Sequence, residues 1–422
     1  MHVIGTSGHV DHGKSSLVSI LTGIDPDRLN EEKSRGMTID LGFSWLKLSN
    51  GNEVSIVDVP GHQKFIDNMV AGIGCIDLAV LVVAADESVM PQTIEHISIL
   101  DLLQVKLGII VITKTDLADK NWLELVQGDI LDVTKGTFLE KAPIVQVSSH
   151  NLDGINLLKS IIEEELSKVE PITNLDRPRV FIDRSFSMSG FGAVVTGTLV
   201  DGDIKIGEVV NFVSSGLTAR IRGIQTHKKS LQIASPGTRV AINLSGISHN
   251  QINQRGEVLV VGDWLVSTIA VDVKLYALFN ISKPLKHNMF INFHSGTFEI
   301  IGKLRLLSAD SIMPGESSFA QIKFDKPVAL VRGDKFIIRS NQITLGGGQV
   351  LEVNVPRHKK NDLKVSDRLS ILESGSDNEI VSEFIQSNEP IKFDELKNLT
   401  GLSNINFILN ELIIDKKKAE LI

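Results

Sequence analysis

A single cysteine, Cys75, occurs among the 422 residues, so the chain cannot form an internal disulfide bond. Because Cys75 lies in an apolar run, we interpret it as a buried structural thiol. No uninterrupted apolar stretch reaches the roughly 18 residues that a membrane-spanning helix needs. The N-terminal sequence also lacks the basic and then apolar layout of a secretory signal peptide. Together these absences predict a cytoplasmic protein without a membrane partner.

Positive charge is not in excess either, since the formal net charge is −8. Taken alone, an acidic balance argues against nucleic acid as a partner. Basic residues are concentrated at 228–229, 357–360 and 416–418, where they could act locally but are more simply solvated faces. With 42% hydrophobic and 22% charged residues, the composition is that of an ordinary globular protein. At roughly 100–200 residues per domain, the length predicts two to four domains.

The first 172 residues alternate short apolar runs with helix-like segments. Apolar runs that we interpret as buried strands lie at residues 2–7, 54–60, 78–86, 108–116 and 143–149. Helical patterns lie between them at Ser15–Thr22, Gln63–Ala71, Pro91–Leu103 and Ile155–Leu166. This alternation predicts an α/β domain, residues 1–172, with a mostly parallel sheet that helices cover on both faces.

The sequence pattern changes at a linker marked by Pro171, Asp176 and Pro178. Short β-rich runs separated by glycine, aspartate and asparagine follow, which is typical of small antiparallel barrels. Their extent suits two barrels, which we place at residues 173–262 and 263–356. The last segment, residues 360–422, is helical and charged and predicts one compact module.

The segment from Gly8 to Ser15 matches the phosphate-binding pattern GxxxxGK[ST] between a predicted strand and a predicted helix. Its glycines allow backbone N–H groups to point at phosphate oxygens, at the positive end of a helix dipole. Lys14 would neutralise β- and γ-phosphate charge, and the Ser15 hydroxyl would bind magnesium. Asp58 ends the next apolar strand, so it would lie beside this loop and hold magnesium through water. The Gly61 N–H can meet the γ-phosphate.

A second motif, Thr113-Lys114-Thr115-Asp116, closes a later strand. The Asp116 carboxylate can accept hydrogen bonds from N1–H and the exocyclic amine of guanine, so it selects GTP over ATP. Ser148 and Ser149 would support the base through backbone contacts. The residues expected to contact GTP or GDP are Gly8, His9, Val10, Asp11, His12, Gly13, Lys14, Ser15, Ser16, Asp58, Gly61, Thr113, Lys114, Asp116, Ser148 and Ser149.

The motifs GHVDHGK and DxPGH, together with residues 31–39, resemble those of the translational GTPases as a group. The resemblance implies that Thr38 ligates magnesium only when the γ-phosphate is present, and so acts as a switch. It also implies that His62 is the catalytic residue that orients the attacking water. The expected magnesium ligands are therefore Ser15, Thr38 and, through water, Asp58.

A narrower resemblance, over nearly residues 1–355, is to the selenocysteine-specific elongation factor family, SelB. It rests on residues 22–43, 85–103, 182–200 and 236–247, and on Thr113 in place of the usual asparagine of the base motif. The resemblance implies a GTP-hydrolysing factor that delivers selenocysteinyl-tRNA to the ribosome and releases it on hydrolysis. The implied fold is a P-loop GTPase domain, two antiparallel β-barrels and a short winged-helix-like C-terminal module.

Selenocysteine differs from serine and cysteine because its selenol is mostly ionised at neutral pH. A pocket selective for it should offer fixed positive charge, which Arg184 and Arg239 could supply, with Asp183 holding one guanidinium in place. In the SelB family these positions line the aminoacyl pocket. Bacterial members carry several winged-helix modules that reach an mRNA hairpin, whereas this chain has room for about one, which could be truncated. An mRNA hairpin is therefore a candidate partner only, and we expect a monomer.

Three other interpretations stay open. General aminoacyl-tRNA carriers resembling elongation factor Tu, and initiation-factor γ subunits, belong to the same class, although the Asp183–Arg184 pair and Thr113 count against them. Sulfate-activating complexes contain a similar GTPase with two barrels, and tests with sulfate, ATP and a partner subunit would separate that case. A regulator with a decayed GTPase is disfavoured by intact motif residues, namely Lys14, Ser15, Thr38, Asp58, His62 and Asp116.

Overall fold

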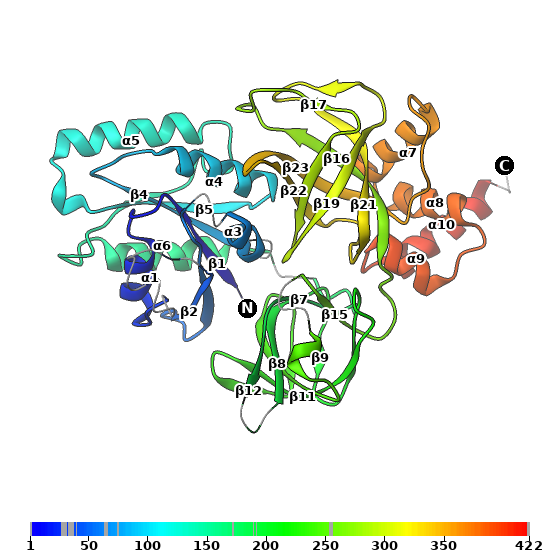
Figure 1. Cartoon of the computed structure of the whole chain (residues 1–422), viewed down its shortest axis with the longest axis horizontal. Coiled ribbons are helices and arrows are strands. Elements are labelled where there is room, and N and C mark those ends of the chain that lie inside the picture. The colour runs from blue at the N-terminus through cyan, green and yellow to red at the C-terminus, as the bar shows by residue number, and fades with distance from the viewer. Residues whose placement is uncertain are drawn as a thin grey trace.

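The computed structural model describes residues 2–26, 32, 38, 40–62, 66–73, 76–170, 173–188, 190, 192–252 and 256–419. Cys75 lies outside these residues, so its interpretation as a buried thiol stays a prediction. Figure 1 shows three successive parts: an α/β domain in blue and cyan, two barrels in green and yellow, and an orange-to-red helical module beside the second barrel. None of the helices in the described ranges is long and apolar enough to cross a membrane.

The α/β domain contains a six-stranded sheet in the order β2-β3-β1-β4-β5-β6. Its strands are β1 (Val3–Gly8), β2 (Gly42–Lys47), β3 (Glu53–Asp58), β4 (Leu78–Ala84), β5 (Leu107–Thr113) and β6 (Ile144–Gln146). Its helices are α1 (Lys14–Thr22), α3 (Ile66–Ile73), α4 (Pro91–Leu102), α5 (Lys120–Thr134) and α6 (Ile155–Ser167). The strands pair in parallel, except that the edge strand β2 runs antiparallel to β3.

Helices cover both faces of this sheet because side chains of the central strand alternate between two cores. Val80 and Val82 face the core that α1 and α6 close, whereas Leu81 and Val83 face α5. Helices α3 and α4 pack on the second face, against Ala79 and its neighbours. The predicted doubly covered, mostly parallel sheet is therefore confirmed. Strand β2 and helix α5 were not among the segments that the sequence pattern singled out.

The first barrel is a seven-stranded antiparallel sheet in the order β10-β15-β7-β8-β14-β11-β12, and β10 also pairs with β11, which closes a ring of six strands. The strands are β7 (Arg179–Met188), β8 (Gly192–Val200), β10 (Val209–Phe212), β11 (Thr218–Thr226), β12 (Lys229–Leu231), β14 (Arg239–Ser245) and β15 (Val258–Val261). A short pair, β9 (Ile204–Lys205) with β13 (Ile233–Ala234), accompanies it. Alternate residues point inward, as Val240, Ile242 and Leu244 do in β14.

The second barrel is closed by six strands in the order β16-β21-β19-β18-β22-β23. They are β16 (Thr268–Ala277), β18 (Phe290–Ser295), β19 (Phe298–Leu306), β21 (Ser317–Val328), β22 (Lys335–Ser340) and β23 (Ile343–Val353). A separate short pair joins β17 (Leu285–Lys286) to β20 (Ser311–Ile312). The Phe293 ring lies at the centre, 5.0 Å from the Phe324 ring and 4.9 Å from the Phe336 ring between centroids. The predicted pair of antiparallel barrels is thus confirmed.

Four helices follow the second barrel: α7 (Leu363–Ser374), α8 (Asp377–Asn388), α9 (Phe393–Thr400) and α10 (Ile405–Ala419). Their apolar core includes Leu369, Val381 and Phe384, and it is continuous with Leu307 and Leu351 of the barrel. The helical module is confirmed, and its described residues contain no strand. The narrower comparison with a winged helix stays a prediction. The side chains of residues 416–418 lie outside what the structure describes.

Buried arginines connect the barrels to each other and to the helical module. Arg179 in β7 forms two hydrogen bonds of 2.9 Å to Asp334 in the second barrel. Arg177 donates to the carbonyl of Asn398 at 2.9 Å, near the C-terminal end of α9. Arg332 donates to the carbonyl of Thr400, the last residue of α9, at 3.1 Å. It also donates to the carbonyl of Leu372, in the last turn of α7, at 2.8 Å. Guanidinium groups thus bind helix carbonyls that have no partner within the helix.

Candidate nucleotide-binding site

The loop between β1 and α1 has the backbone geometry of a phosphate cradle. Gly8 has φ +129°, and a Cβ there would overlap the carbonyl oxygen of Val82 in β4. Gly13 is left-handed with φ +82°, and no side chain caps the first turn of α1 that it starts. Both positions therefore require glycine. The uncapped N–H groups at the start of the helix favour an anion such as phosphate.

Lys14 and Gly61 meet at the mouth of this loop. The Lys14 ammonium is buried and donates to the carbonyls of Gly8 at 3.0 Å and His9 at 2.5 Å. A Cβ at Gly61 would overlap Lys14 Nζ and lie only 2.7 Å from the backbone nitrogen of Val10. The chain after β3 is therefore pressed against the phosphate loop, which suits a contact with the same phosphate. His62 follows in this turn and is half-buried.

Hard oxygen atoms gather beside the loop. Ser15 Oγ donates to Asp58 Oδ2 at 2.7 Å and lies 2.7 Å from Thr38 Oγ1. The fully buried Asp58 also accepts from Thr6 Oγ1 at 2.7 Å through its other oxygen. Ser15, Thr38 and Asp58 come from three motifs, of which the first and last are 43 positions apart, and they meet at one point. Hydroxyl and carboxylate oxygens fit magnesium.

Thr6 is a member of this cluster that the motifs did not identify. Its hydroxyl also accepts from the Val59 N–H at 3.1 Å, so it ties the end of β3 to β1. A polar residue two positions before Gly8, in a strand that is buried throughout, was the available signal. Among the residues that the structure describes, no group of three or more His, Cys, Asp and Glu side chains could hold a metal.

The predicted base-binding residues lie at the ends of β5 and β6. Asp116 Oδ1 accepts from Ser148 Oγ at 2.5 Å, and this hydrogen bond lowers the pKa of the carboxyl group. The same serine oxygen accepts the N–H groups of His150 at 3.2 Å and Asn151 at 3.1 Å. Ser148 thus holds Asp116 through its side chain, whereas we expected backbone contacts to the base. Ser149 follows directly in the same loop.

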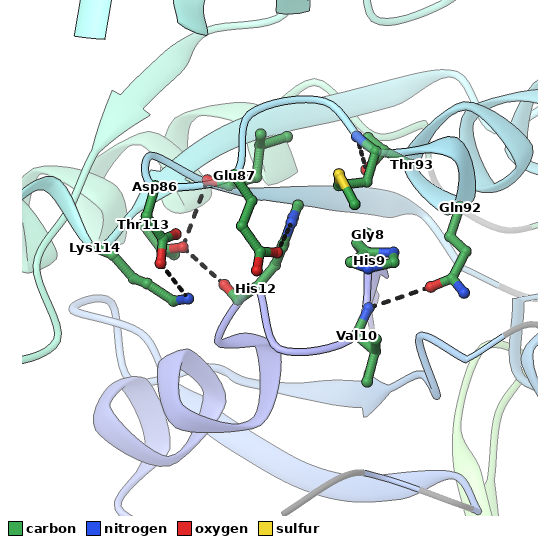
Figure 2. A network of polar contacts seen from close by, with 12 residues as sticks. Gly8, His9, Val10, His12, Asp86, Glu87, Gln92, Thr93, Thr113 and Lys114 are labelled. Atoms are coloured by element: carbon green, nitrogen blue, oxygen red, sulfur yellow. Dashed lines mark hydrogen bonds and ion pairs between the residues drawn. The ribbon is translucent and has the colours of Figure 1, made fainter. Parts of the chain in front are cut away.

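Thr113 connects the end of β5 to the phosphate loop, and Lys114 pairs with an aspartate that follows β4. Thr113 Oγ1 donates to the carbonyl of His12 at 2.7 Å. The ammonium of Lys114, a residue with φ +55°, lies 2.9 Å from Asp86 Oδ2. Figure 2 shows Thr113 and Lys114 beside His12 and the loop that carries Asp86 and Glu87. A threonine at this position therefore keeps a structural role, because its hydroxyl bridges β5 and the loop.

Two buried histidines support the phosphate loop, and the sequence motifs assigned no role to one of them. His96 in α4 accepts the Gly8 N–H through Nδ1 at 3.0 Å, and burial lowers its pKa to about 3. Burial likewise lowers the pKa of His12 to about 4, although Nε2 lies 3.3 Å from Glu87. Both rings are therefore neutral at pH 7. Gln92, one helical turn before His96, accepts the Val10 N–H at 3.4 Å (Figure 2).

The remaining predicted nucleotide contacts are exposed positions of the loop and helix. Asp11, with φ +63°, lies at the exposed tip of the loop, and Ser16 is exposed in the first turn of α1. His9 contacts His12 edge to face, with centroids 5.1 Å apart. Burial lowers the pKa of His9 as well. The structure thus brings all predicted nucleotide residues to one edge of the sheet, at the carboxyl ends of β1, β3, β5 and β6.

The predicted aminoacyl-pocket residues also lie together, between the first barrel and β2. Asp183 holds Arg239 by two hydrogen bonds of 2.5 and 3.1 Å and accepts from Thr196 at 2.7 Å. Burial raises the pKa of Asp183, but Arg239 outweighs this effect and the net pKa is lowered. The Arg239 guanidinium lies 3.3 Å from the centre of the Phe43 ring, and that of Arg184 lies 5.3 Å from it. A cavity of about 250 Å³ adjoins Phe43 and Arg239.

Models of known protein families match the α/β domain and both barrels of this chain. The family model described as the Elongation factor Tu GTP binding domain matches residues 1–168, and that for Elongation factor Tu domain 2 matches residues 192–260. A third model, described as the Selenocysteine-specific elongation factor, beta-barrel domain, matches residues 272–357. The α/β domain and both barrels are thus each matched by a translation-factor family.

Curated relatives are named selenocysteine-specific elongation factors. The protein from Desulfomicrobium baculatum is 43% identical over 363 residues, which cover 85% of this chain and 57% of that protein. The Haemophilus influenzae protein is 37% identical (86% and 58% covered), and the Escherichia coli protein is 33% identical (85% and 56% covered). The chain therefore spans little more than half the length of the curated relatives it matches.

Solved structures show the same likeness. The crystal structure of a bacterial selenocysteine-specific elongation factor, EF-Sec, superposes with a TM-score of 0.84 at 30% identity, covering 96% of this chain and 66% of the other. SelB from Methanococcus maripaludis in complex with the GTP analogue GppNHp superposes with a TM-score of 0.74 at 26% identity. The match covers 85% of this chain and 80% of the other. The chain therefore belongs to the translational GTPases, within the family of selenocysteine-specific elongation factors.

Proposed function

We propose that the chain is a GTPase that binds selenocysteinyl-tRNA in its GTP state, delivers it to the ribosome and releases it on GTP hydrolysis. The observation that carries the proposal is the pair of arginines, Arg184 and Arg239, set beside the nucleotide domain against one aromatic ring. The names of the curated relatives support it. We take the acting unit to be a monomer and keep an mRNA hairpin as a candidate partner of the helical module.

The nucleotide would bind along the carboxyl edge of the sheet. The N–H groups at the start of α1 and the Lys14 ammonium would hold the β- and γ-phosphates. Ser15, Thr38 and Asp58 would hold magnesium, which neutralises phosphate charge when bound. Asp116, oriented by Ser148, would accept hydrogen bonds from guanine.

The arginines would discriminate between aminoacyl groups by charge. A selenolate accepts charge-assisted hydrogen bonds from a guanidinium, each contributing about 1.5–3 kcal/mol, whereas a neutral hydroxyl forfeits most of this energy. At about 1.4 kcal/mol per tenfold, one arginine corresponds to about tenfold or more in affinity. Asp183 keeps Arg239 fixed, so little conformational freedom is lost on binding.

The experiment that tests the proposal compares selenocysteinyl-, cysteinyl- and seryl-tRNA in binding to the GTP-bound protein. We expect a clear preference for selenocysteinyl-tRNA. Arg239→Ala should shrink the gap to seryl-tRNA by about tenfold, at unchanged GTP affinity. Equal binding of the three tRNAs by the unmodified protein would instead indicate a general aminoacyl-tRNA carrier.

Asp116→Asn is expected to move nucleotide preference from guanosine toward xanthosine. Xanthine carries a carbonyl where guanine has its exocyclic amine, and the asparagine amide can donate a hydrogen bond to it. One exchanged charge-assisted hydrogen bond corresponds to about tenfold or more for each nucleotide. Competition of GTP and XTP against labelled GDP measures the shift.

Asp86→Asn is the matched control for this substitution, because Asp86 pairs with Lys114 of the base motif but is not itself expected to contact the base. It should leave the GTP to XTP ratio unchanged. If Asp116→Asn kept full selectivity for GTP, the base site would have to lie elsewhere.

A further inference from the structure

Arg184 is held by the nucleotide domain and not by its own barrel. Its Nη2 donates at 2.7 Å to Asp40 Oδ2 and at 2.7 Å to the carbonyl oxygen of Leu41. The other carboxylate oxygen of Asp40 accepts the Leu41 N–H at 2.9 Å, which fixes the rotamer of Asp40. The Asp40 and Arg184 side chains are 31% and 29% exposed, so the pair lies at the rim of the interface with solvent access.

Arg239, by contrast, is held within the barrel. Asp183 in β7 binds two of its nitrogen atoms, and Asp183 is itself held by Thr196 in β8. These hydrogen bonds lie within the barrel, and the guanidinium also stacks on Phe43 of β2, 3.3 Å from the ring centre. The barrel therefore provides the hydrogen bonds that hold Arg239, whereas the segment that carries Asp40 and Leu41 provides those that hold Arg184.

The same segment reaches the phosphate site at its other end. Thr38, two positions before Asp40, has its hydroxyl 2.7 Å from Ser15 Oγ, which is 2.7 Å from Asp58. Two residues span at most about 7 Å of extended chain, so Thr38 and Asp40 cannot be placed independently. The arrangement that puts Thr38 among the candidate metal ligands also puts the Asp40 carboxylate on Arg184.

We propose that Asp40 is a positioning residue that makes the placement of Arg184, and hence preference for selenocysteine, depend on the γ-phosphate. With Thr38 in place, Asp40 and Leu41 engage Nη2 of Arg184. The Nε and Nη1 N–H groups take no part in this contact, so donors remain for a selenolate. When Thr38 leaves the phosphate site, Asp40 releases Arg184 and only Arg239 stays preset. This inference rests on the proposed function and names the regulation of that site.

The test measures equilibrium binding of selenocysteinyl- and seryl-tRNA to the full chain, with a non-hydrolysable GTP analogue and with GDP. Asp40→Asn removes the charge at nearly constant shape. The ratio of the two affinities should fall about tenfold with the GTP analogue and stay unchanged with GDP, which lies within the usual 5- to 150-fold span of couplings between sites. GDP affinity should not change, because Asp40 does not hold Arg184 in that state.

Arg184→Ala should lower the same affinity ratio, because Asp40→Asn and Arg184→Ala both disrupt the contact between Asp40 and Arg184. The double variant should lose no more preference than Arg184→Ala alone. Glu53→Gln is the matched control, since Glu53 forms a 2.7 Å ion pair with Lys229 across the same interface, away from the two arginines. It should leave the affinity ratio unchanged.

The outcomes separate this inference from the function on which it rests. A preference for selenocysteinyl-tRNA that survives Asp40→Asn overturns the inference alone. A parallel loss for both tRNAs also overturns it, because a purely structural role would act in that way. A gain in selenocysteinyl-tRNA affinity overturns it too, since Asp40 would then compete with the selenolate. No GTP-dependent preference in the unmodified protein overturns the proposed function and the inference together.

Discussion

Replacement of His62 by alanine is expected to reduce ribosome-stimulated GTP hydrolysis by on the order of 10³-fold or more, while GTP binding survives. His62 follows Gly61, whose backbone is pressed against Lys14 and the phosphate loop, so its ring is carried on a segment that lies against this loop. A group that orients the attacking water acts in the transition state and contributes little to nucleotide affinity. Single-turnover hydrolysis with ribosomes and equilibrium GTP binding measure the two effects separately.

His249→Ala provides the control for this substitution. His249 lies in a short 3-10 helix, His249–Gln251, of the first barrel and should have no effect on hydrolysis. If His62→Ala lowered GTP affinity as much as hydrolysis, the histidine would be a structural part of the turn and the catalytic role would have to be abandoned.

Arg179→Ala is expected to have the largest effect on stability, a loss of about 3–5 kcal/mol in the free energy of unfolding of the two barrels. The Arg179 side chain is 4% exposed and is bound by Asp334 and Asp201. Burial lowers its pKa, but these two carboxylates outweigh the effect and the net pKa is raised. Without the guanidinium, two mostly buried carboxylates would face each other unpaired, which costs more than the lost contacts themselves.

Urea unfolding followed by circular dichroism measures this loss, and Lys229→Ala is its matched control. Lys229 also forms an ion pair between domains, with Glu53, but its side chain is 65% exposed. Exposed pairs contribute about 0–1 kcal/mol, so the control should unfold close to the unmodified protein. Equal midpoints for the two variants would mean that the buried ion pair does not stabilise the joint between the barrels.

Short-range sequence features were enough to propose a nucleotide site because its candidate residues come from contiguous segments. The spacing from Gly8 to Ser15 specifies a turn, a cradle and a helix start without help from distant residues, and the structure has this geometry. The apolar runs that became β1, β3, β4 and β5 were equally plain, because a strand buried on both faces is apolar throughout. The apolar pattern did not single out strand β2, because this strand lies at the edge of the sheet and has an exposed Lys47 at its end.

Contacts between segments that are distant in the sequence could not be predicted from local patterns. His96 supports the phosphate loop from a position 88 residues away, and in sequence it is one of several polar residues of α4. The sequence of β1 alone does not show that Thr6 contacts Asp58, because this contact requires β3 to pair beside β1. Asp183 and Arg184 are adjacent in sequence, yet their side chains diverge on a strand, so Asp183 holds Arg239 while Arg184 reaches Asp40.

The sequence by itself determined the class of fold, the phosphate and base motifs, and the residue types available for magnesium and for a selenolate. These features follow from local spacing and from the alternation of apolar residues, which act over a few positions of the chain. Only the tertiary structure decided which arginine each carboxylate holds, that Thr38 and Asp40 link the phosphate site to Arg184, and that buried arginines fasten the barrels and the helical module. Hydrogen bonds and ion pairs act over about 3 Å in space, and residues far apart in the sequence come that close only when strands, helices and domains pack.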